Sequence, residues 1–379
     1  MNSKKKILIA YANAGAGHRK AAYAIDDVFK RMNRNDIEVK TIDTLDYSTA
    51  FLRKSYPAFY LFMVNKIPTL WGLGYYLFDT RIVNRLFILP ARRISNSLNC
   101  SGLVDFLRQY NPDIVINTHF LGSEVMADMK RRGMLKDTKL ISTVTDYFMH
   151  SFWVDKGIDF YCVAQNESKE HLIKRGIPSE KIKVFGIPVS SVFAVRKGRK
   201  ELCDRLNIKY GCRTVLIGSG GFGVGPIKEL VKELSTIKDI QLLVVCGNNP
   251  KLYKEISEFA KSSDMPIQVY EFVDNMDELM EVADVMVTKS GGLTSSEAMA
   301  KDLPMIITSA IPGQEARNCR YLIEAEAAIQ AKNVRKAKEA ILDLLNSDTK
   351  MAQLRQKIDQ VKKPNSSYNI ANFALNLLQ

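Results

Sequence analysis

The residues best suited to chemistry lie in residues 284–321, where two polar loops each follow a short apolar run. The runs 285–288 and 304–307 contain β-branched residues and have the length of buried strands. Gly291 and Gly292 end the first run and open a loop before a helical stretch. This region is therefore predicted to form strand, loop, helix, strand, loop and helix in that order.

The first loop is suited to binding an anion. Two adjacent glycines let backbone N–H groups approach a ligand, and a helix that begins there adds unpaired N–H groups and the positive end of its dipole. Thr294 and Ser295 are predicted to cap this helix. Lys289 beside the loop can add a full positive charge, and Glu297 in the first helical turn can accept hydrogen bonds from a ribose.

The second loop carries Gln314, Glu315 and Asn318, whose amides and carboxylate suit the hydroxyl groups of a sugar. A Gly-Gly turn alone is also found at ordinary strand–helix junctions. Two polar loops after successive strands are a more specific signal, because ligands of open α/β sheets bind outside the carboxyl ends of the strands. The two loops together favour a ligand that combines an anionic group with sugar hydroxyls.

The N-terminal part of the chain opens with a strand–helix–strand unit. Strand 6–11, loop 12–17, helix 18–32 and strand 37–42 follow one another, which predicts a doubly wound α/β sheet. Lys20 stands where a dinucleotide-binding fingerprint requires its third glycine, so NAD binding is disfavoured. No G-x-x-x-x-G-K-[ST] run is present, so ATP binding of the P-loop type has no support.

The same alternation restarts after a charged, Gly-containing run at 196–200. A strand at 213–217 leads into the glycine-rich run 218–225, and a helix and a further strand follow. A chain of 379 residues has room for two such domains. The predicted division is an N-terminal domain at 1–195, a linker at 196–210, a C-terminal domain at 211–364 and a helical tail at 365–379.

The composition limits the class of protein. The 54 Lys and Arg residues exceed the 41 Asp and Glu residues by 13, which suits nucleic acid, anionic lipid or an anionic nucleotide without choosing among them. Six cysteines without a C-x-x-C pair fit a reduced chain better than a disulfide framework or a zinc site. The apolar run 7–12 is too short for a signal peptide, and no stretch of uncharged apolar residues is long enough to predict a membrane span.

Residues 51–95 differ in composition from the rest of the chain, with seven basic residues and one acidic residue. Aromatic side chains interleaved with Lys and Arg suit a membrane interface that contains anionic lipid. The same composition suits RNA, and a pair of core-facing helices with a solvated basic side would also explain it. In a chain with a sugar-binding loop the lipid interpretation is favoured. The candidate membrane residues are Trp71, Tyr75, Arg81 and Arg85.

Three of the four histidines lie where ligands bind in α/β folds. His18 follows the first glycine loop, His119 ends a predicted strand, and His150 lies shortly beyond another, whereas His171 has the setting of a surface residue. Their wide spacing, without H-x-x-x-H or a neighbouring Cys pair, argues against zinc.

Six motifs in this order resemble the monogalactosyldiacylglycerol synthase and processive diacylglycerol glucosyltransferase family of glycosyltransferase family 28. A more distant resemblance is to the peptidoglycan lipid-intermediate N-acetylglucosaminyltransferase. The resemblance implies the GT-B fold, in which two doubly wound Rossmann-like domains face a cleft and a C-terminal helix crosses back onto the first domain. The motifs are GAGHRKAA (15–22), TDYFMHSFW (145–153), GGFGV (220–224), EFVDNM (271–276), SGGLTSSE (290–297) and PGQEARN (312–318).

The resemblance assigns expected roles to individual residues. His18 matches the proposed catalytic histidine and is the expected base that takes a proton from the acceptor hydroxyl. His119, Asp146, His150 and Trp153 are expected to line the acceptor cleft. The expected donor-binding residues are Gly17, Gly221, Phe222, Gly223, Phe272, Val273, Lys289, Gly291, Gly292, Leu293, Thr294, Ser295, Glu297, Gln314, Glu315 and Asn318.

The expected activity is inverting transfer of glucose from UDP-glucose to 1,2-diacylglycerol, with further sugars added to the product, by a peripheral protein at the cytoplasmic face of the cell membrane. Because the chain contains no Asp-x-Asp, neither a metal ion nor a cofactor is expected, and backbone amides with Lys or Arg must meet the leaving diphosphate. No nucleic-acid partner is expected. Galactosyl transfer from UDP-galactose is the first alternative, and a non-catalytic membrane- or RNA-binding protein is the second.

Overall fold

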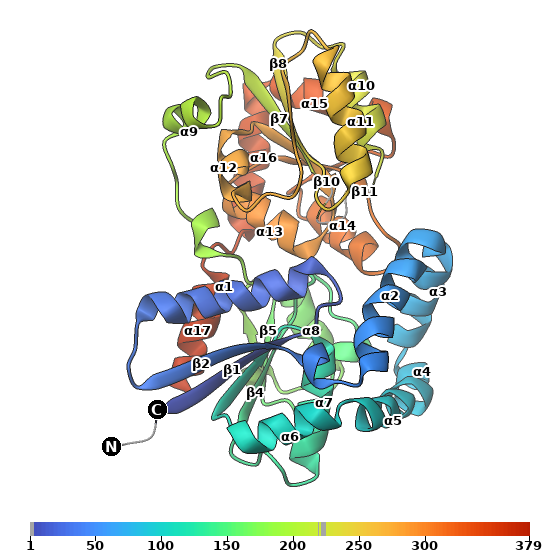
Figure 1. The fold of residues 1–379 in the computed structure, drawn as a ribbon, viewed down its shortest axis with the longest axis vertical. Helices are drawn as coiled ribbons and strands as arrows, with labels where there is room; N and C mark the ends of the chain where they lie inside the picture. The colour runs from blue at the N-terminus through green and yellow to red at the C-terminus, as the bar shows by residue number, and fades with distance from the viewer. Residues whose placement is uncertain (1–3, 219, 221–224) are drawn as a thin grey trace. The chain divides into compact units, whose positions relative to one another are not determined.

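The computed structural model describes residues 4–218, 220 and 225–379, which divide into two units. Unit 1 runs to Ser191 and also includes residues 311–314 and Asn365–Gln379. Unit 2 contains Val192–Ala310 and Glu315–Pro364. Each unit is built on its own parallel sheet (Figure 1), so the predicted doubly wound α/β fold is confirmed.

The sheet of unit 1 has the strand order β2-β1-β3-β4-β5-β6, with all neighbours parallel. Parallel neighbours require crossover connections, which place helices on both faces of the sheet. The strands are β1 (Lys5–Tyr11), β2 (Ile37–Asp43), β3 (Ile114–Asn117), β4 (Lys139–Thr143), β5 (Phe160–Val163) and β6 (Ile182–Val184). The helices that cover the sheet are α1 (Ala16–Met32), α6 (Ser101–Tyr110), α7 (Phe120–Arg131), α8 (Asn166–Lys174) and α17 (Ser366–Asn376).

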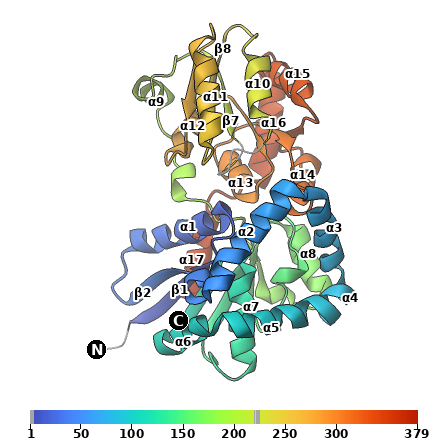
Figure 2. The same cartoon turned by 45° about the vertical axis from the view of Figure 1, so that its right-hand side comes forward.

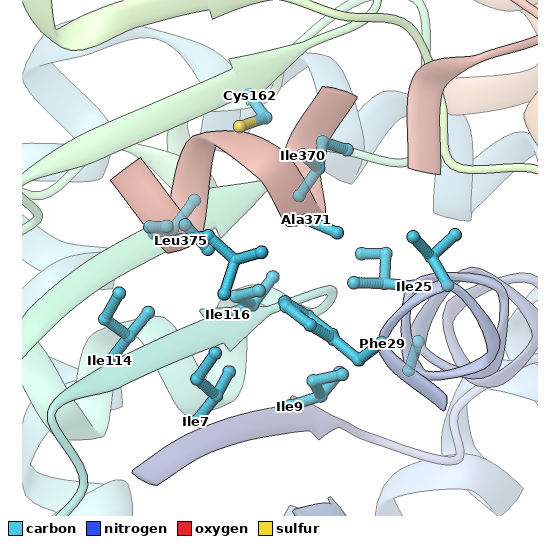
Figure 3. Packing of buried hydrophobic residues seen from close by; sticks show 14 of the residues in the cluster. Ile7, Ile9, Ile25, Phe29, Ile114, Ile116, Cys162, Ile370, Ala371 and Leu375 are labelled. Atoms are coloured by element: carbon cyan, nitrogen blue, oxygen red, sulfur yellow. The ribbon is translucent and has the colours of Figure 1, made fainter. Parts of the chain in front are cut away.

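Alternate side chains of β1 enter two different hydrophobic cores, as the period of a strand requires. Ile7 and Ile9 pack with residues of α1 and α17 on one face of the sheet (Figure 3). Leu8 and Ala10 pack with residues of α6 and α7 on the other face. Burial on both faces explains why β1 reads as a continuous apolar run instead of an alternating one.

The C-terminal helix α17 completes the first of these cores. Ile370 and Leu375 point toward the sheet, beside Phe29 of α1 (Figure 3). Ser366 at the start of the helix donates a hydrogen bond to the Ile187 carbonyl at 2.7 Å, and Ser367 donates to the Val189 carbonyl at 2.7 Å. The last segment of the chain is therefore an integral part of unit 1.

A string of helices is inserted in unit 1 between β2 and α6 (Figure 2). None of the helices that the structure describes is long and apolar enough to cross a membrane. The inserted helices are α2 (Ala50–Lys66), α3 (Pro68–Asp79), α4 (Arg81–Val83), a π-helical segment (Asn84–Ile88) and α5 (Leu89–Asn99). Short 3-10 turns in and beside unit 1 are Thr44–Tyr47, Ser151–Trp153, Ser179–Lys181 and Ser191–Phe193.

The sheet of unit 2 has the strand order β12-β11-β10-β7-β8-β9, again all parallel. The strands are β7 (Arg213–Gly218), β8 (Ile240–Val245), β9 (Ile267–Tyr270), β10 (Val285–Lys289), β11 (Met305–Ser309) and β12 (Ile329–Gln330). The helices are α9 (Arg199–Arg205), α10 (Ile227–Leu234), α11 (Pro250–Lys261), α12 (Met276–Val282), α13 (Gly292–Ala300), α14 (Gln314–Glu324), α15 (Val334–Leu345) and α16 (Asp348–Val361).

Residues 196–210, expected to form a linker, are folded onto unit 2. They include α9, whose Arg199 pairs through two nitrogens with Asp284 at 3.0 Å each. Lys197 pairs with Asp277 at 2.7 Å and with Glu278 at 2.9 Å. Because these acids are largely buried, the basic residues neutralise them and hold the segment in place.

Candidate functional site

Unit 1 gathers three of the predicted residues at the carboxyl ends of adjacent strands. His18 lies in the first turn of α1 after β1, His119 is the N-cap of α7 after β3, and Trp153 ends the turn beyond β4. The His18 ring centroid lies 4.5 Å from that of His119 and 6.3 Å from that of Trp153. The sheet order β1-β3-β4 brings together residues that are up to 135 positions apart in the chain.

The hydrogen bonds of His18 define which ring nitrogen can act as a base. Its Nδ1 lies 2.8 Å from the Thr118 carbonyl oxygen. Because a carbonyl oxygen only accepts, Nδ1 carries the proton in this arrangement and Nε2 keeps its lone pair. The Thr145 hydroxyl lies 3.0 Å from the same Nδ1, and the Thr118 hydroxyl donates to the His18 carbonyl at 2.9 Å. The ring is therefore fixed by two threonines that the sequence did not single out.

The surroundings of the two histidines keep them neutral. Removal of water from around the His18 ring lowers its pKa to about 4, and the bond to the Thr118 carbonyl opposes this only in part. His18 as a whole residue is partly exposed. Burial lowers the pKa of His119 well below its ordinary value, and His18 and Arg92 lower it further. A neutral imidazole is the form that can accept a proton.

His119 and His150 have structural partners of their own. His119 is buried, and its Nδ1 accepts a hydrogen bond from the Leu121 N–H at 3.1 Å. His150 Nδ1 accepts from the Phe152 N–H at 3.2 Å, while its Nε2 donates to the Tyr75 carbonyl at 2.9 Å. His119 therefore caps α7 and forms a wall of the cluster, whereas His150 ties its loop to α3.

The remaining candidates for the acceptor cleft and for the membrane surface differ in their exposure to solvent. Asp146 follows Thr145 and is partly exposed. Arg81 and Arg85 are exposed and Trp71 is half-buried. Tyr75 is only 7% exposed and packs on His150 with ring centroids 4.4 Å apart, so the prediction that it contacts a membrane is corrected. The sequence could not separate these aromatic residues because α3 has a weak amphipathic pattern.

Two of the seven basic residues in 51–95 face inward. The Arg92 guanidinium lies 4.7 Å from the Phe120 ring centroid and 4.1 Å from that of Phe152, and it pairs with the buried Glu124 at 2.8 Å. Arg93 lies 3.6 Å from the buried Asp155. These arginines anchor α5 to the body of unit 1 and leave its apolar residues Ile94 and Leu98 outward, at 63% and 72% exposure.

In unit 2 the predicted anion-binding loop connects β10 to α13. The helix begins at Gly292 with Gly291 as its N-cap, and no side chain caps it in the described structure. The prediction that Thr294 and Ser295 cap the helix is therefore wrong, because both lie inside its first turns. The extended backbone of Gly291 lets the helix start directly after the strand, so its first N–H groups face the loop.

The two polar loops of unit 2 meet through a charged pair. Lys289, at the end of β10, forms an ion pair with Glu315 in the first turn of α14. The Ser290 hydroxyl donates to the Glu315 carbonyl oxygen at 2.7 Å. Asn318 is buried on α14, and Glu297 is buried on α13.

The other donor-side candidates lie at strand ends or outside the described residues. Phe272, 40% exposed, and Val273 follow β9, whereas Gln314 begins α14. Leu293 is buried in α13, and Gly17 lies in the first turn of α1. Gly221, Phe222 and Gly223 lie outside the described residues. Among the described residues, no group of three or more His, Cys, Asp and Glu side chains is arranged to hold a metal ion.

Two parallel doubly wound units, each with candidate residues at the carboxyl ends of its strands, are the architecture of the GT-B fold. Solved structures share the fold across almost the whole chain. MurG of Acinetobacter baumannii has a TM-score of 0.60 at 14% identity, covering 97% of this chain and 99% of that chain. The UDP complex of MnaA from S. aureus has a TM-score of 0.62 at 14% identity, covering 98% of this chain and 97% of that chain.

Sequence comparison resolves the class further. The monogalactosyldiacylglycerol (MGDG) synthase model matches residues 18–189, and the glycosyltransferase family 28 C-terminal domain model matches residues 214–374. The two models match successive parts of the chain and together cover most of it. A processive diacylglycerol beta-glucosyltransferase of Bacillus cereus (strain B4264) is 28% identical, over 99% of this chain and 94% of that protein. One of the same name from Bacillus licheniformis is 28% identical, over 97% of this chain and 94% of that protein.

Proposed function

We propose that this chain transfers glucose from UDP-glucose to the free hydroxyl of 1,2-diacylglycerol, with inversion at the sugar carbon and without a metal ion. The relatives named above support the donor and the acceptor. The observation that carries the proposal is the state of His18, a neutral imidazole whose Nδ1 is occupied by Thr118 and whose Nε2 is left as a base.

The proposed reaction is a single displacement. His18 Nε2 takes the proton of the acceptor hydroxyl while the acceptor oxygen forms a bond to the anomeric carbon of glucose. The bond between that carbon and the diphosphate oxygen breaks, and its electron pair leaves with UDP. Attack opposite to the leaving group inverts the configuration. Thr118 and Thr145 hold the imidazole in place, so little reorganisation is needed at the moment of proton transfer.

The donor is proposed to bind at the loops of unit 2. The first N–H groups of α13, at Gly292 and Leu293, face the diphosphate together with the positive end of the helix dipole. The buried Glu297 accepts from the ribose hydroxyls, and Glu315 with Gln314 accepts and donates to the hexose.

Galactose is the alternative hexose, because the model that matches residues 18–189 describes MGDG synthases. Glucose and galactose differ in the orientation of one hydroxyl. Glucose is favoured by the names of the relatives that align along nearly the whole chain. Chromatography of the lipid products formed from radiolabelled UDP-glucose and UDP-galactose, side by side, decides between them and shows how many sugars are added.

The decisive test of catalysis uses diacylglycerol vesicles and a His18→Ala variant. The variant should lose about two to four orders of magnitude in turnover while it still binds UDP, because a general base contributes that much to rate. His171→Ala, on α8 and outside the histidine cluster, is the matched control and should keep activity. Activity that survives in His18→Ala, or that EDTA abolishes, would contradict the base or the metal-free mechanism respectively.

We also propose that the inserted helices dock on an anionic membrane face, which would make the protein peripheral at the inner side of the cell membrane. Large apolar side chains that would be unfavourable in water are exposed along these helices, with exposed Arg53, Lys54, Lys66, Arg81 and Arg85 among them. The exposed apolar residues are Phe51, Phe59, Phe62, Ile67, Leu70, Leu73, Tyr76, Leu77, Ile82, Leu86, Phe87, Ile94 and Leu98.

Sedimentation with vesicles tests this docking. Each basic residue near an anionic surface contributes about 1 kcal/mol, so replacing Arg81 and Arg85 by Glu should weaken binding at least roughly tenfold. Replacing Arg320 and Arg335, exposed in unit 2, by Glu is the control that changes net charge equally. Equal losses in both variants, or RNA binding that exceeds vesicle binding, would contradict a membrane-docking surface at the inserted helices.

A further inference from the structure

The pair Lys289–Glu315 joins the two loops that the proposed function assigns to the donor. Lys289 ends β10, three residues before α13, and Glu315 lies in the first turn of α14. Their side chains are 20% and 7% exposed, so the pair is shielded from water. Shielding strengthens the attraction between them and makes a lone charge at either position unfavourable.

The Lys289 side chain also passes close to the backbone of Gly220. Gly220 has a φ of +71°, and a Cβ built on it would lie only 2.9 Å from Lys289 Cε. The aliphatic part of the lysine therefore lies against a glycine. Ser290 donates to the Glu315 carbonyl oxygen at 2.7 Å and ties the start of α14 to the loop.

This geometry changes the role expected for the lysine. A cation that binds the diphosphate should lie beside the N-terminus of α13, where the diphosphate is proposed to bind. Lys289 instead directs its ammonium group at Glu315, so that the pair has no net charge. The diphosphate is then stabilised mainly by the N–H groups of Gly292 and its neighbours, which no side chain caps in the described structure.

We propose that Lys289 is a positioning residue that holds the Glu315 carboxylate in one orientation for the hydroxyls of the transferred hexose, which makes it a determinant of sugar specificity. The proposal rests on the proposed function, in which Glu315 contacts the hexose. A carboxylate binds sugar hydroxyls well only if its oxygens keep one orientation, and a charged hydrogen-bond partner provides that. Lys289 does so without touching the sugar.

Binding measurements with two ligands separate this role from a contact to the diphosphate. UDP contains the phosphates without the hexose, whereas UDP-glucose contains both. Lys289→Met should leave the Kd of UDP within about twofold and weaken UDP-glucose by at least about tenfold, the effect of losing a charged hydrogen bond. Lys289→Arg should restore much of the loss, because it keeps the ion pair.

Three comparisons strengthen the test. In a Glu315→Gln background the further change Lys289→Met should have little effect on UDP-glucose binding, because the group that Lys289 positions is already neutral. Lys289→Met should also bring the Kd values of UDP-glucose and UDP-galactose closer together than they are in the wild-type protein. Lys228→Met, which removes the partly exposed pair Lys228–Glu255 in the same unit, is the matched control and should change the Kd of neither ligand.

The outcomes are distinguishable. If Lys289→Met weakens UDP as much as UDP-glucose, Lys289 meets the diphosphate and the inference is overturned while the proposed function stands. If the wild-type protein binds UDP no differently from UDP-glucose and transfers no hexose, the proposed function fails and the inference fails with it. Retained UDP binding in Lys289→Met also shows that the variant is folded.

Discussion

Lowering the pH tests the neutral state of His18 directly. If the base had the ordinary histidine pKa of 6.5, only roughly a tenth of it would be neutral at pH 5.5, against about nine tenths at pH 7.5. With its pKa lowered to about 4, about 97% stays neutral at pH 5.5. We therefore expect kcat/KM for UDP-glucose to change by less than about twofold between these two pH values.

The assay is the initial rate of glycolipid formation at subsaturating UDP-glucose in diacylglycerol vesicles, across pH 5 to 8. A tenfold fall in kcat/KM with an apparent pKa near 6.5 would refute the reasoning, because it would mean that the imidazole titrates as if in water. His171→Ala should give the wild-type profile. The donor is kept subsaturating because kcat/KM reports ionisations of the free enzyme.

The same lowered pKa predicts the sign of the pH dependence of stability. Between pH 6.5 and about 4 the unfolded chain binds a proton at His18 that the folded chain does not bind, so acidification favours unfolding. The free energy of unfolding should fall by at most about 1.4 kcal/mol per pH unit from this residue. Urea titrations at pH 7 and 5.5 give the free energy of unfolding of wild type and of His18→Asn. If this free energy changes equally with pH in both proteins, the prediction is contradicted.

Three further substitutions test the packing that positions the site. Asp79→Asn should lower the free energy of unfolding, measured in urea, by about 3 kcal/mol. The buried Asp79 carboxylate accepts hydrogen bonds from the Ser151 N–H at 2.8 Å and from the Ser151 hydroxyl at 2.7 Å. A loss under about 1 kcal/mol would contradict this role. Gly122→Ala should destabilise by about 1–3 kcal/mol, seen as a lower Tm, since its Cβ would overlap Asn117 Oδ1. Ile370→Ala should cost about 2–5 kcal/mol in the same urea assay if α17 is part of the unit 1 core.

Much of the fold follows from local patterns. Apolar runs such as 7–10 and 285–287 become buried parallel strands because continuous apolar sequence is what a sheet covered on both faces requires. The glycines at 291 and 292 indicate the loop, and α13 starts at the second of them. The predicted caps Thr294 and Ser295 would start the helix three or four residues later, because a side-chain cap was expected where the glycine backbone sets the start.

The surface of the inserted helices was predicted only in part. Basic and aromatic composition marked residues 51–95, yet composition does not say which side of a helix meets the protein. Arg92 faces inward because it pairs with the buried Glu124 and lies over two phenylalanine rings. Tyr75 faces inward because it packs on His150. Those partners are 28 to 75 positions distant in sequence, beyond any local pattern.

By itself, the sequence determined the two doubly wound units, the family resemblance and the identity of the residues available for chemistry, since these depend on periodicity and on short motifs. Only the tertiary structure decided their state. The tautomer of His18 depends on the Thr118 carbonyl, 100 residues away, and its lowered pKa depends on the removal of water around the ring. The pairing of Lys289 with Glu315 depends on two parallel strands lying side by side. Ionisation and hydrogen bonding respond to neighbours in space, and the chain order does not contain those neighbours until the sheets have formed.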